Sequence, residues 1–159
     1  MAELASEAAA TRPGERTGDA PARHVVFRVA GERYALPLEA VREVVPPQPP
    51  FARVPRASEA VRGVMNLRGR VVAVVDLAAL VGLAPQPLAE GVGHVVILDQ
   101  DRRTLGFLVG AVAGVEPLAP PAEGGAGLVR GVTAARAGAV TVLGAAALMD
   151  AAVALFGGR

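Results

Sequence analysis

The side chains that most often carry out catalysis are few in this chain, and they are not placed together. Its two histidines, His24 and His94, each begin a predicted strand, and its only serines are Ser6 and Ser58. Neither serine lies in the Gly-x-Ser-x-Gly turn that raises a nucleophile above a sheet, so no Ser-His-Asp triad is predicted. Because the chain has no lysine, a phosphate-binding loop of the Walker type is excluded.

Acidic and sulfur-bearing groups do not point to a reaction either. Cysteine is absent, which excludes disulfides and thiolate metal sites, and His, Asp and Glu do not recur at the spacing of metal ligands. Asp99 and Asp101 flank a predicted hairpin tip, where turn formation accounts for them. We expect a protein that is not an enzyme and that holds no cofactor or metal. The alternative, a small enzyme on a barrel scaffold, would require a buried cluster of His and carboxylate.

Arginine is the polar side chain that gathers in the first half of the chain. Arg68 follows Asn66 and precedes Gly69, in a polar corner between two β-branched strands. Gly69 tolerates the positive φ of a tight reversal. We expect Arg68 at the apolar junction of the two strands, where a guanidinium needs a carboxylate. Its candidate partner is Glu43, and three of the arginines around it are expected on a solvated rim: Arg53, Arg56 and Arg70.

Composition bounds the class of protein. The chain has 159 residues, of which 52% are apolar and 3% aromatic, so its core must consist of Val, Leu and Ala in small sheets. A net charge of +1 does not provide the broad basic field of a nucleic-acid binder. The apolar stretch at residues 137–158 contains Asp150 and is rejected as a membrane span. No secretory signal is expected in the charged residues 1–21.

Turn residues and β-branched runs divide the chain into short elements. Residues 1–22 are interpreted as a disordered tail, and strands at 24–29 and 33–36 flank a turn at Gly31. Pro37 is expected to open a short helix over 38–44, and four prolines then force an extended connection. The remaining predictions before the linker at 84–93 are a strand at 51–54, a helical turn at 58–62, the hairpin around Gly69, and a helix at 77–81 closed by Gly82.

The second half repeats the first. Residues 94–97 echo residues 24–27, and residues 131–136 align without a gap onto residues 63–68, which places Arg136 opposite Arg68. We predict a mostly β domain over 23–159, with two subdomains at roughly 23–83 and 93–150. Short strands of this kind close best as small barrels, because closure removes exposed edges.

The corner also identifies a family. Residues 63–77 read Gly-Val-x-Asn-Leu-Arg-Gly-x-Val-Val-x-Val-Val-Asp-Leu, which resembles the signature of CheW-like adaptor domains, the non-enzymatic couplers of bacterial chemosensory arrays. The resemblance covers about residues 24–150. It implies two intertwined, five-stranded, SH3-like barrels with short helices, in which strands can be exchanged between the halves.

The resemblance also implies partners and sites. It predicts a cytoplasmic scaffold, recruited to receptor arrays, that links the cytoplasmic tip of methyl-accepting chemoreceptors to the regulatory domain of a CheA-like histidine kinase, with no nucleic acid bound and no direct membrane insertion. Gly106 matches a family glycine with a structural or interface role. The residues that the resemblance places at the receptor contact are Val41, Glu43, Gly63, Asn66, Arg68 and Gly69.

Two departures from the family pattern lie in the second half. Gly110 stands where the family usually has an acidic residue, and Gly144 stands where it usually has Asp. Kinase binding is therefore expected to be weaker than in relatives with the acidic residues. An alternative function is that of a CheW-like interaction protein in a divergent pathway, such as surface motility, that binds only one of the two partners.

Overall fold

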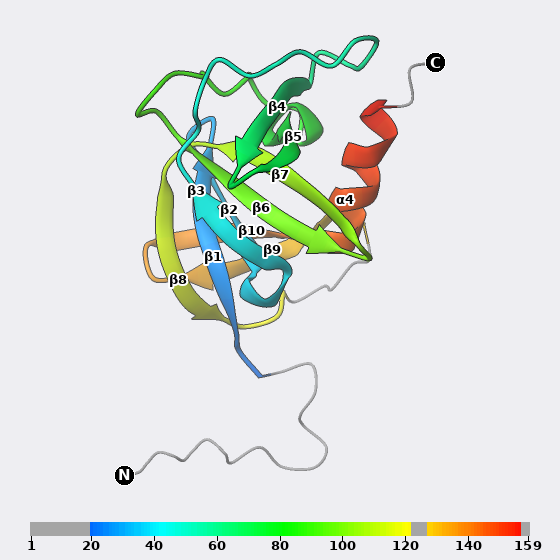
Figure 1. Cartoon of the computed structure of the whole chain (residues 1–159). Coiled ribbons are helices and arrows are strands. Elements are labelled where there is room, and N and C mark those ends of the chain that lie inside the picture. Colours follow the sequence, from blue (N-terminus) through cyan, green and yellow to red (C-terminus); the bar gives the residue numbers. More distant parts are fainter. Residues whose placement is uncertain (1–19, 122–126, 157–159) are drawn as a thin grey trace.

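Two five-stranded sheets and four short helices make up the described part of this protein (Figure 1). The structure is a computed structural model that describes residues 20–121 and 127–156, so most of the predicted N-terminal tail lies outside it. The first sheet has the order β8-β1-β2-β10-β9 and consists of β1 (Ala22–Val29), β2 (Glu32–Pro37), β8 (Val112–Leu118), β9 (Val129–Ala135) and β10 (Gly138–Leu143). The second has the order β3-β6-β7-β5-β4 and consists of β3 (Val41–Val45), β4 (Val61–Leu67), β5 (Arg70–Asp76), β6 (His94–Gln100) and β7 (Arg103–Val109).

Each sheet combines strands from both halves of the chain. The hairpin β1–β2 joins β8, β9 and β10, whereas the hairpin β6–β7 joins β3, β4 and β5. The two joins are parallel: β2 pairs with β10, and β5 pairs with β7. The outer strands β8 and β9 approach each other, so the first sheet curves back on itself. This arrangement confirms the predicted mostly β fold of two intertwined five-stranded units.

The main core lies where the two sheets face each other. It includes Phe27 of the first sheet, Phe107 of the second, and Leu148 of α4 (Ala145–Val153). Each sheet also has one smaller buried cluster of its own. The cluster of the second sheet lies around Ile97, and that of the first sheet lies around Val26. Successive side chains of a strand point to opposite sides. Because both sides are buried here, β1 and β6 contain continuous apolar runs rather than alternating ones.

Three predicted local elements differ from the structure. The helix expected over 38–44 is a single 3-10 turn, η1 (Leu38–Ala40), after which β3 pairs with β6. Val41 and its β-branched neighbours gain more from packing in a sheet than from helical spacing. The strand expected at 51–54 is reduced to one bridge between Ala52 and Val64. Of the helical turn expected at 58–62, a single turn forms, in which the Val61 N–H donates to the Ser58 carbonyl at 2.9 Å, and β4 begins at Val61.

The helices are few and short. The helix predicted at 77–81 is confirmed as α3 (Leu77–Leu80), and Gly82 follows with a φ of +78°. The described part of the apolar stretch, residues 137–156, contains β10, α4 and η2 (Ala154–Phe156). None of the helices in the described residues has the length and apolarity to span a bilayer.

Candidate protein-docking site

A two-residue turn forms the corner between β4 and β5. Leu67 pairs with Arg70, and the turn residues Arg68 and Gly69 have φ values of +54° and +85°, as a type I′ hairpin requires. The Asn66 side-chain oxygen accepts a hydrogen bond of 2.7 Å from the Gly69 backbone N–H. For Arg68 the left-handed conformation costs about 1 kcal/mol, so the neighbouring contacts must hold it in place.

The strongest of these contacts is a bidentate ion pair with Glu43. Arg68 Nη1 donates to Glu43 Oε2 at 2.8 Å, and Arg68 Nη2 donates to Glu43 Oε1 at 2.6 Å, the fork geometry that arginine prefers with a carboxylate. The pair joins β3, an outer strand of the second sheet, to the turn that follows β4, the other outer strand.

The predicted pairing of Arg68 with Glu43 is confirmed, but the reason given for it was wrong. The Arg68 side chain is 69% exposed, so it lies on the surface and not at an apolar junction. Glu43 is the better-buried partner, and it stands in a strand rather than at the end of a helix. The main role of the pair is therefore to orient the exposed guanidinium of Arg68, because no buried charge has to be neutralised there.

Electrostatics keep this pair ionised at neutral pH. The hydrogen bond from Arg68 lowers the pKa of Glu43, and the charges of Arg68 and Arg42 lower it further against the desolvation of the carboxyl. The same hydrogen bond and charge raise the pKa of Arg68. Protonation of Glu43 therefore requires acid conditions.

Beside the ion pair lies a small pocket of about 100 Å³ with excess positive charge. Asp99 accepts hydrogen bonds from Arg42 Nη1, at 2.6 Å, and from the Thr104 hydroxyl. These bonds, with the charges of Arg42 and Arg70, lower the pKa of Asp99 against its desolvation. Three guanidiniums thus surround two carboxylates. The lining consists of Arg42, Glu43, Leu67, Arg68, Arg70, Val72 and Thr104.

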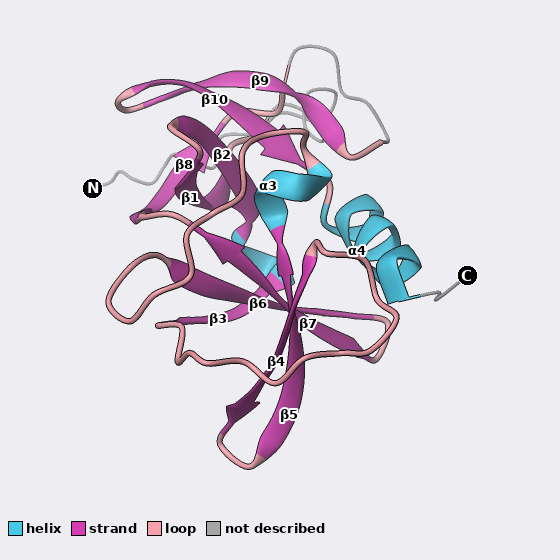
Figure 2. Ribbon diagram, turned by 90° about the horizontal axis from the view of Figure 1, so that it is seen from above, coloured by secondary structure: helices cyan, strands magenta, loops and turns pink. Residues whose placement is uncertain are grey.

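An exposed apolar side chain accompanies this charge. Val71, next to Arg70 on β5, is 73% exposed. Figure 2 shows the β4–β5 turn projecting at the outer end of the second sheet. The corner is therefore accessible to a partner with acidic and apolar side chains, and nothing in its geometry suits bond making.

The structure does not gather every predicted contact residue at this corner. Glu43, Asn66, Arg68 and Gly69 lie there, whereas half-buried Val41 packs against the main core. At Gly63, with a φ of +136°, a Cβ would lie 2.5 Å from the Ala52 carbonyl oxygen. This glycine therefore lets Phe51 and Ala52 pack against the edge of β4.

Gly106 has a similar structural role in β7. A Cβ on it would lie 2.7 Å from Val95 Cγ1 and 3.3 Å from Ile97 Cδ1, inside the core of the second sheet. Close packing thus accounts for the glycine. A direct contact of Gly63 or Gly106 with a partner stays a prediction.

A buried carboxylate that sequence reasoning left unused anchors the first half. Asp76 accepts hydrogen bonds of 3.1 Å each from Arg62 Nη1 and from the backbone N–H groups of Ala78 and Gln86. Arg62 Nη1 also donates to the Gln86 carbonyl at 2.7 Å. The segment predicted as a linker is thus fixed to the hairpin and to α3. The sequence did contain a signal for this site, namely an Asp at the end of an apolar strand. A carboxylate buried at that place needs hydrogen-bond donors around it.

The histidines and Ser58 form no catalytic group. His24 Nδ1 lies 2.7 Å from the Ala22 carbonyl, and His94 Nδ1 lies 3.5 Å from that of Gly110. Ser58 Oγ accepts from the Ala60 N–H at 3.1 Å. Among the residues described, no group of three or more His, Asp and Glu is placed to hold a metal.

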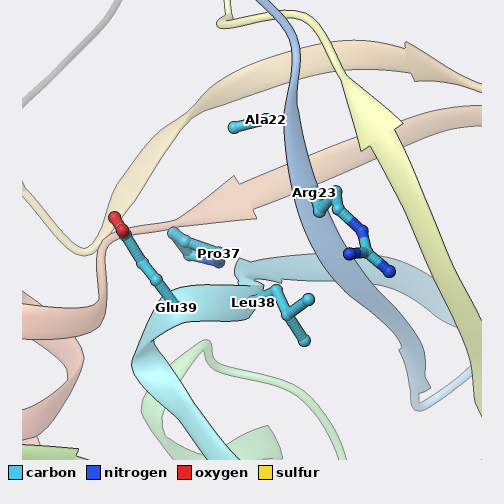
Figure 3. A pocket seen from close by; sticks show the side chains of 5 residues that line it. All are labelled: Ala22, Arg23, Pro37, Leu38 and Glu39. Atoms are coloured by element: carbon cyan, nitrogen blue, oxygen red, sulfur yellow. The ribbon is translucent and has the colours of Figure 1, made fainter.

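A second pocket, of about 320 Å³, opens at the start of β1 (Figure 3). Pro37 and Leu38 form its apolar part, and Arg23 and Glu39 lie on opposite sides of it. One guanidinium and one separate carboxylate do not make an acid–base pair. This pocket is an apolar surface feature rather than a reaction site.

Comparisons with known proteins find a matching family model and several similar proteins. A family model described as "CheW-like domain" matches residues 23–153. The "Probable chemotaxis protein CheW" of Rhizobium etli is 37% identical over 93 residues, and the "Chemotaxis protein CheW" of Rhizobium meliloti is 38% identical over 93 residues; each match covers 57% of this chain and 57% of the relative. "Protein PilI" of Pseudomonas aeruginosa is 29% identical over 90 residues, covering 57% of this chain and 49% of that protein. The aligned part thus spans about half of the length of these relatives.

The fold resembles a solved structure over a larger share of the chain. The crystal structure of "scaffolding protein TtCheW" from Thermoanaerobacter tengcongensis superposes with a TM-score of 0.66 at 26% sequence identity. The superposition covers 77% of this chain and 88% of that one.

Proposed function

The chain belongs to the CheW-like domain family, and from that premise we propose that it is a non-enzymatic scaffold that couples chemoreceptors to a histidine kinase in bacterial chemosensory signalling. The match of the family model to residues 23–153 carries this proposal. Two relatives are named chemotaxis proteins, and the solved neighbour is named a scaffolding protein. We further propose that the protein acts in the cytoplasm, recruited to receptor arrays.

The receptor side of the scaffold is the arginine corner. The proposed contact residues are Val41, Glu43, Gly63, Asn66, Arg68 and Gly69, and the partner is the cytoplasmic tip of a methyl-accepting chemoreceptor. Three features support this assignment. Asn66 and Gly69 hold the turn, Glu43 orients an exposed Arg68, and the adjoining pocket carries excess positive charge. The exposed Val71 adds an apolar contact beside that charge.

The kinase side requires a second surface, which binds the regulatory domain of a CheA-like kinase. A scaffold changes kinase activity only if its complex with the receptor stabilises one kinase state over the other. No chemistry by the scaffold is needed for this, and interfaces of modest area suffice. The described residues offer binding surfaces of that kind and no catalytic group.

The two departures from the family pattern have local structural reasons. The Gly110 N–H donates to the Arg28 carbonyl at 2.7 Å, and a Cβ there would lie 2.9 Å from the Arg28 oxygen. A Cβ on Gly144 would lie 2.9 Å from the Gly127 carbonyl oxygen. We still expect weaker kinase binding than in relatives with acidic residues, which titration with the kinase regulatory domain measures.

Reconstitution tests the proposed function. Receptor tip, kinase and this protein are combined, and kinase autophosphorylation is measured with and without each component. We expect the kinase to respond to the receptor only when this protein is present. Binding of each partner alone is measured in parallel. Binding of the receptor without the kinase, or the reverse, would favour the alternative function of a single-partner protein in a divergent pathway.

A further inference from the structure

The pocket beside the β4–β5 corner is lined by an arginine whose guanidinium is not used within the described part of the chain. Arg68 donates from both Nη groups to Glu43, and Arg42 donates to Asp99. Arg70 also lines this pocket, but its guanidinium forms no hydrogen bond and no ion pair with any other residue that the structure describes. The guanidinium that has all of its donors available to a partner is therefore that of Arg70.

This arginine is a feature of the first half of the chain. The family signature at residues 63–77 leaves the position of Arg70 open, and the alignment of the second half onto the first places Gly138 opposite it. A guanidinium does lie beside Gly138, that of Arg33, but its Nη2 donates to the Ala139 carbonyl at 3.2 Å. Neither the signature nor the repeated fold therefore accounts for Arg70.

The size and the lining of the pocket suit one carboxylate side chain. Its volume of about 100 Å³ corresponds to about three water molecules, whereas sites for whole small molecules have about 300 Å³ or more. Leu67 is half-buried and Val72 is buried, so water is excluded from part of the pocket. An ion pair formed beside such apolar side chains is stronger than one surrounded by water.

We propose that this pocket binds a carboxylate of the receptor tip, and that Arg70 is the residue that pairs with it. This inference rests on the proposed scaffold function, in which the tip docks at this corner. Glu43 and Arg68, two of the proposed receptor contacts, line the same pocket as Arg70, so a partner seated on them also reaches Arg70. The fork between Arg68 and Glu43 occupies the carboxylate that would otherwise be available to Arg70.

Titration of the full chain with a purified receptor-tip fragment, at several salt concentrations, tests the proposal. Arg70→Gln is expected to weaken tip binding by about tenfold, because a charge-assisted hydrogen bond is lost, and to lower the salt dependence of the affinity. Arg70→Lys should bind more tightly than Arg70→Gln, because it keeps the charge and loses only the planar fork. Equal affinities of these two variants would contradict an ion pair.

Arg136→Gln is the matched control, because it removes the same charge from an exposed arginine at the corner between β9 and β10. Figure 2 shows β9 and the β4–β5 turn at opposite ends of the molecule, so this variant should bind the tip as the wild type does. Thermal unfolding of each variant checks that the fold is retained.

Exchange of the two charges tests direct pairing. Arg70→Glu is expected to weaken tip binding by more than about tenfold, because it repels the partner's carboxylate. The acidic residues of the tip are then replaced by arginine one at a time, and one of these tips should restore binding to Arg70→Glu but not to Arg68→Glu. Weak binding that no altered tip restores would overturn the pairing.

The outcomes separate this inference from the function on which it rests. Wild-type tip affinity in both Arg70→Gln and Arg70→Glu, together with weak binding by Arg68→Glu, would overturn the role of Arg70 and leave the receptor contact at the corner intact. A wild-type chain that does not bind the tip would refute the receptor contact itself, and the inference with it.

Discussion

At the corner between β4 and β5, Arg68 uses its side chain to reach a glutamate of β3, whereas at the corner between β9 and β10, Arg136 uses its backbone N–H to reach a glutamate of β8. The first contact is a fork of two bonds to Glu43, and the second is one bond to Glu116. Each contact links a turn to an outer strand of the same five-stranded sheet. In both cases the glutamate accepts the hydrogen bonds, but only the first contact uses a guanidinium.

The turns explain this difference. Arg68 and Gly69 both have positive φ, and Asn66 accepts from the Gly69 N–H. At the second corner Ala134 stands in place of Asn66, and neither Arg136 nor Ala137 has a positive φ. Without glycine and the Asn cap, the same loop length takes a different turn. Repeats with matching strands can thus differ in function through a few turn residues.

The largest change in the free energy of unfolding is expected on removal of Asp76, a carboxylate that has no counterpart in the second half. Asp76→Ala leaves the half-buried Arg62 without its partner and leaves the Ala78 and Gln86 N–H groups without an acceptor. We expect a loss of about 3 kcal/mol in the free energy of unfolding, measured by urea denaturation. Asp99→Ala is the control, since it removes an exposed pair worth less than about 1 kcal/mol. Equal losses in the two variants would contradict the role assigned to Asp76.

A smaller effect is expected where the first half covers its own strand edge. Gly63 and Gly114 have φ values of +136° and +137°, but a Cβ at Gly114 meets nothing within 4 Å. Gly63→Ala is expected to destabilise the protein by about 2 kcal/mol more than Gly114→Ala, because its methyl group overlaps the backbone at Ala52. Both values come from denaturant unfolding. Indistinguishable losses would mean that residues 51–54 move aside easily.

The exposed ion pair of the first corner is expected to matter for binding more than for folding. Arg68→Glu should weaken receptor-tip binding by about tenfold, because it places a carboxylate beside Glu43 and reverses the charge offered to the partner. The free energy of unfolding should stay close to that of the wild type, since the Arg68 side chain is exposed. Arg136→Glu, at the corner whose backbone makes the contact, should leave receptor-tip binding unchanged. Wild-type receptor binding by folded Arg68→Glu would remove the corner from the receptor contact.

The smallest expected effect is a pH dependence. The pKa of Glu43 is lower in the folded protein than in the unfolded chain, where it is about 4.3. The pair with Arg68 therefore stabilises the fold above that pH, and this contribution is lost as the pH falls through the folded-state pKa. Wild type and Arg68→Gln should differ in unfolding free energy at pH 7 and converge in acid. A difference that persists at pH 2 would show that Arg68 stabilises the fold by packing rather than by charge.

Local patterns along the chain were enough to predict two hairpins and the family. Glycine turns and β-branched runs predicted the hairpins of β1–β2 and β4–β5, because those preferences act between neighbours in the chain. The long motif at residues 63–77 indicated the family. The positive charge of Arg68 predicted a carboxylate as its partner. Glu43 was correctly paired even though its element was misassigned.

Features that depend on partners far along the chain became visible only in the folded sheets. β3 is a strand because β6 pairs with it, and Asp76 is buried because Arg62 and Gln86 supply donors. The exposure of Arg68 and Val132 depends on which segments cover the outer strands of each sheet. Hydrogen-bond satisfaction and burial are properties of the assembled sheets, so no local pattern contains them.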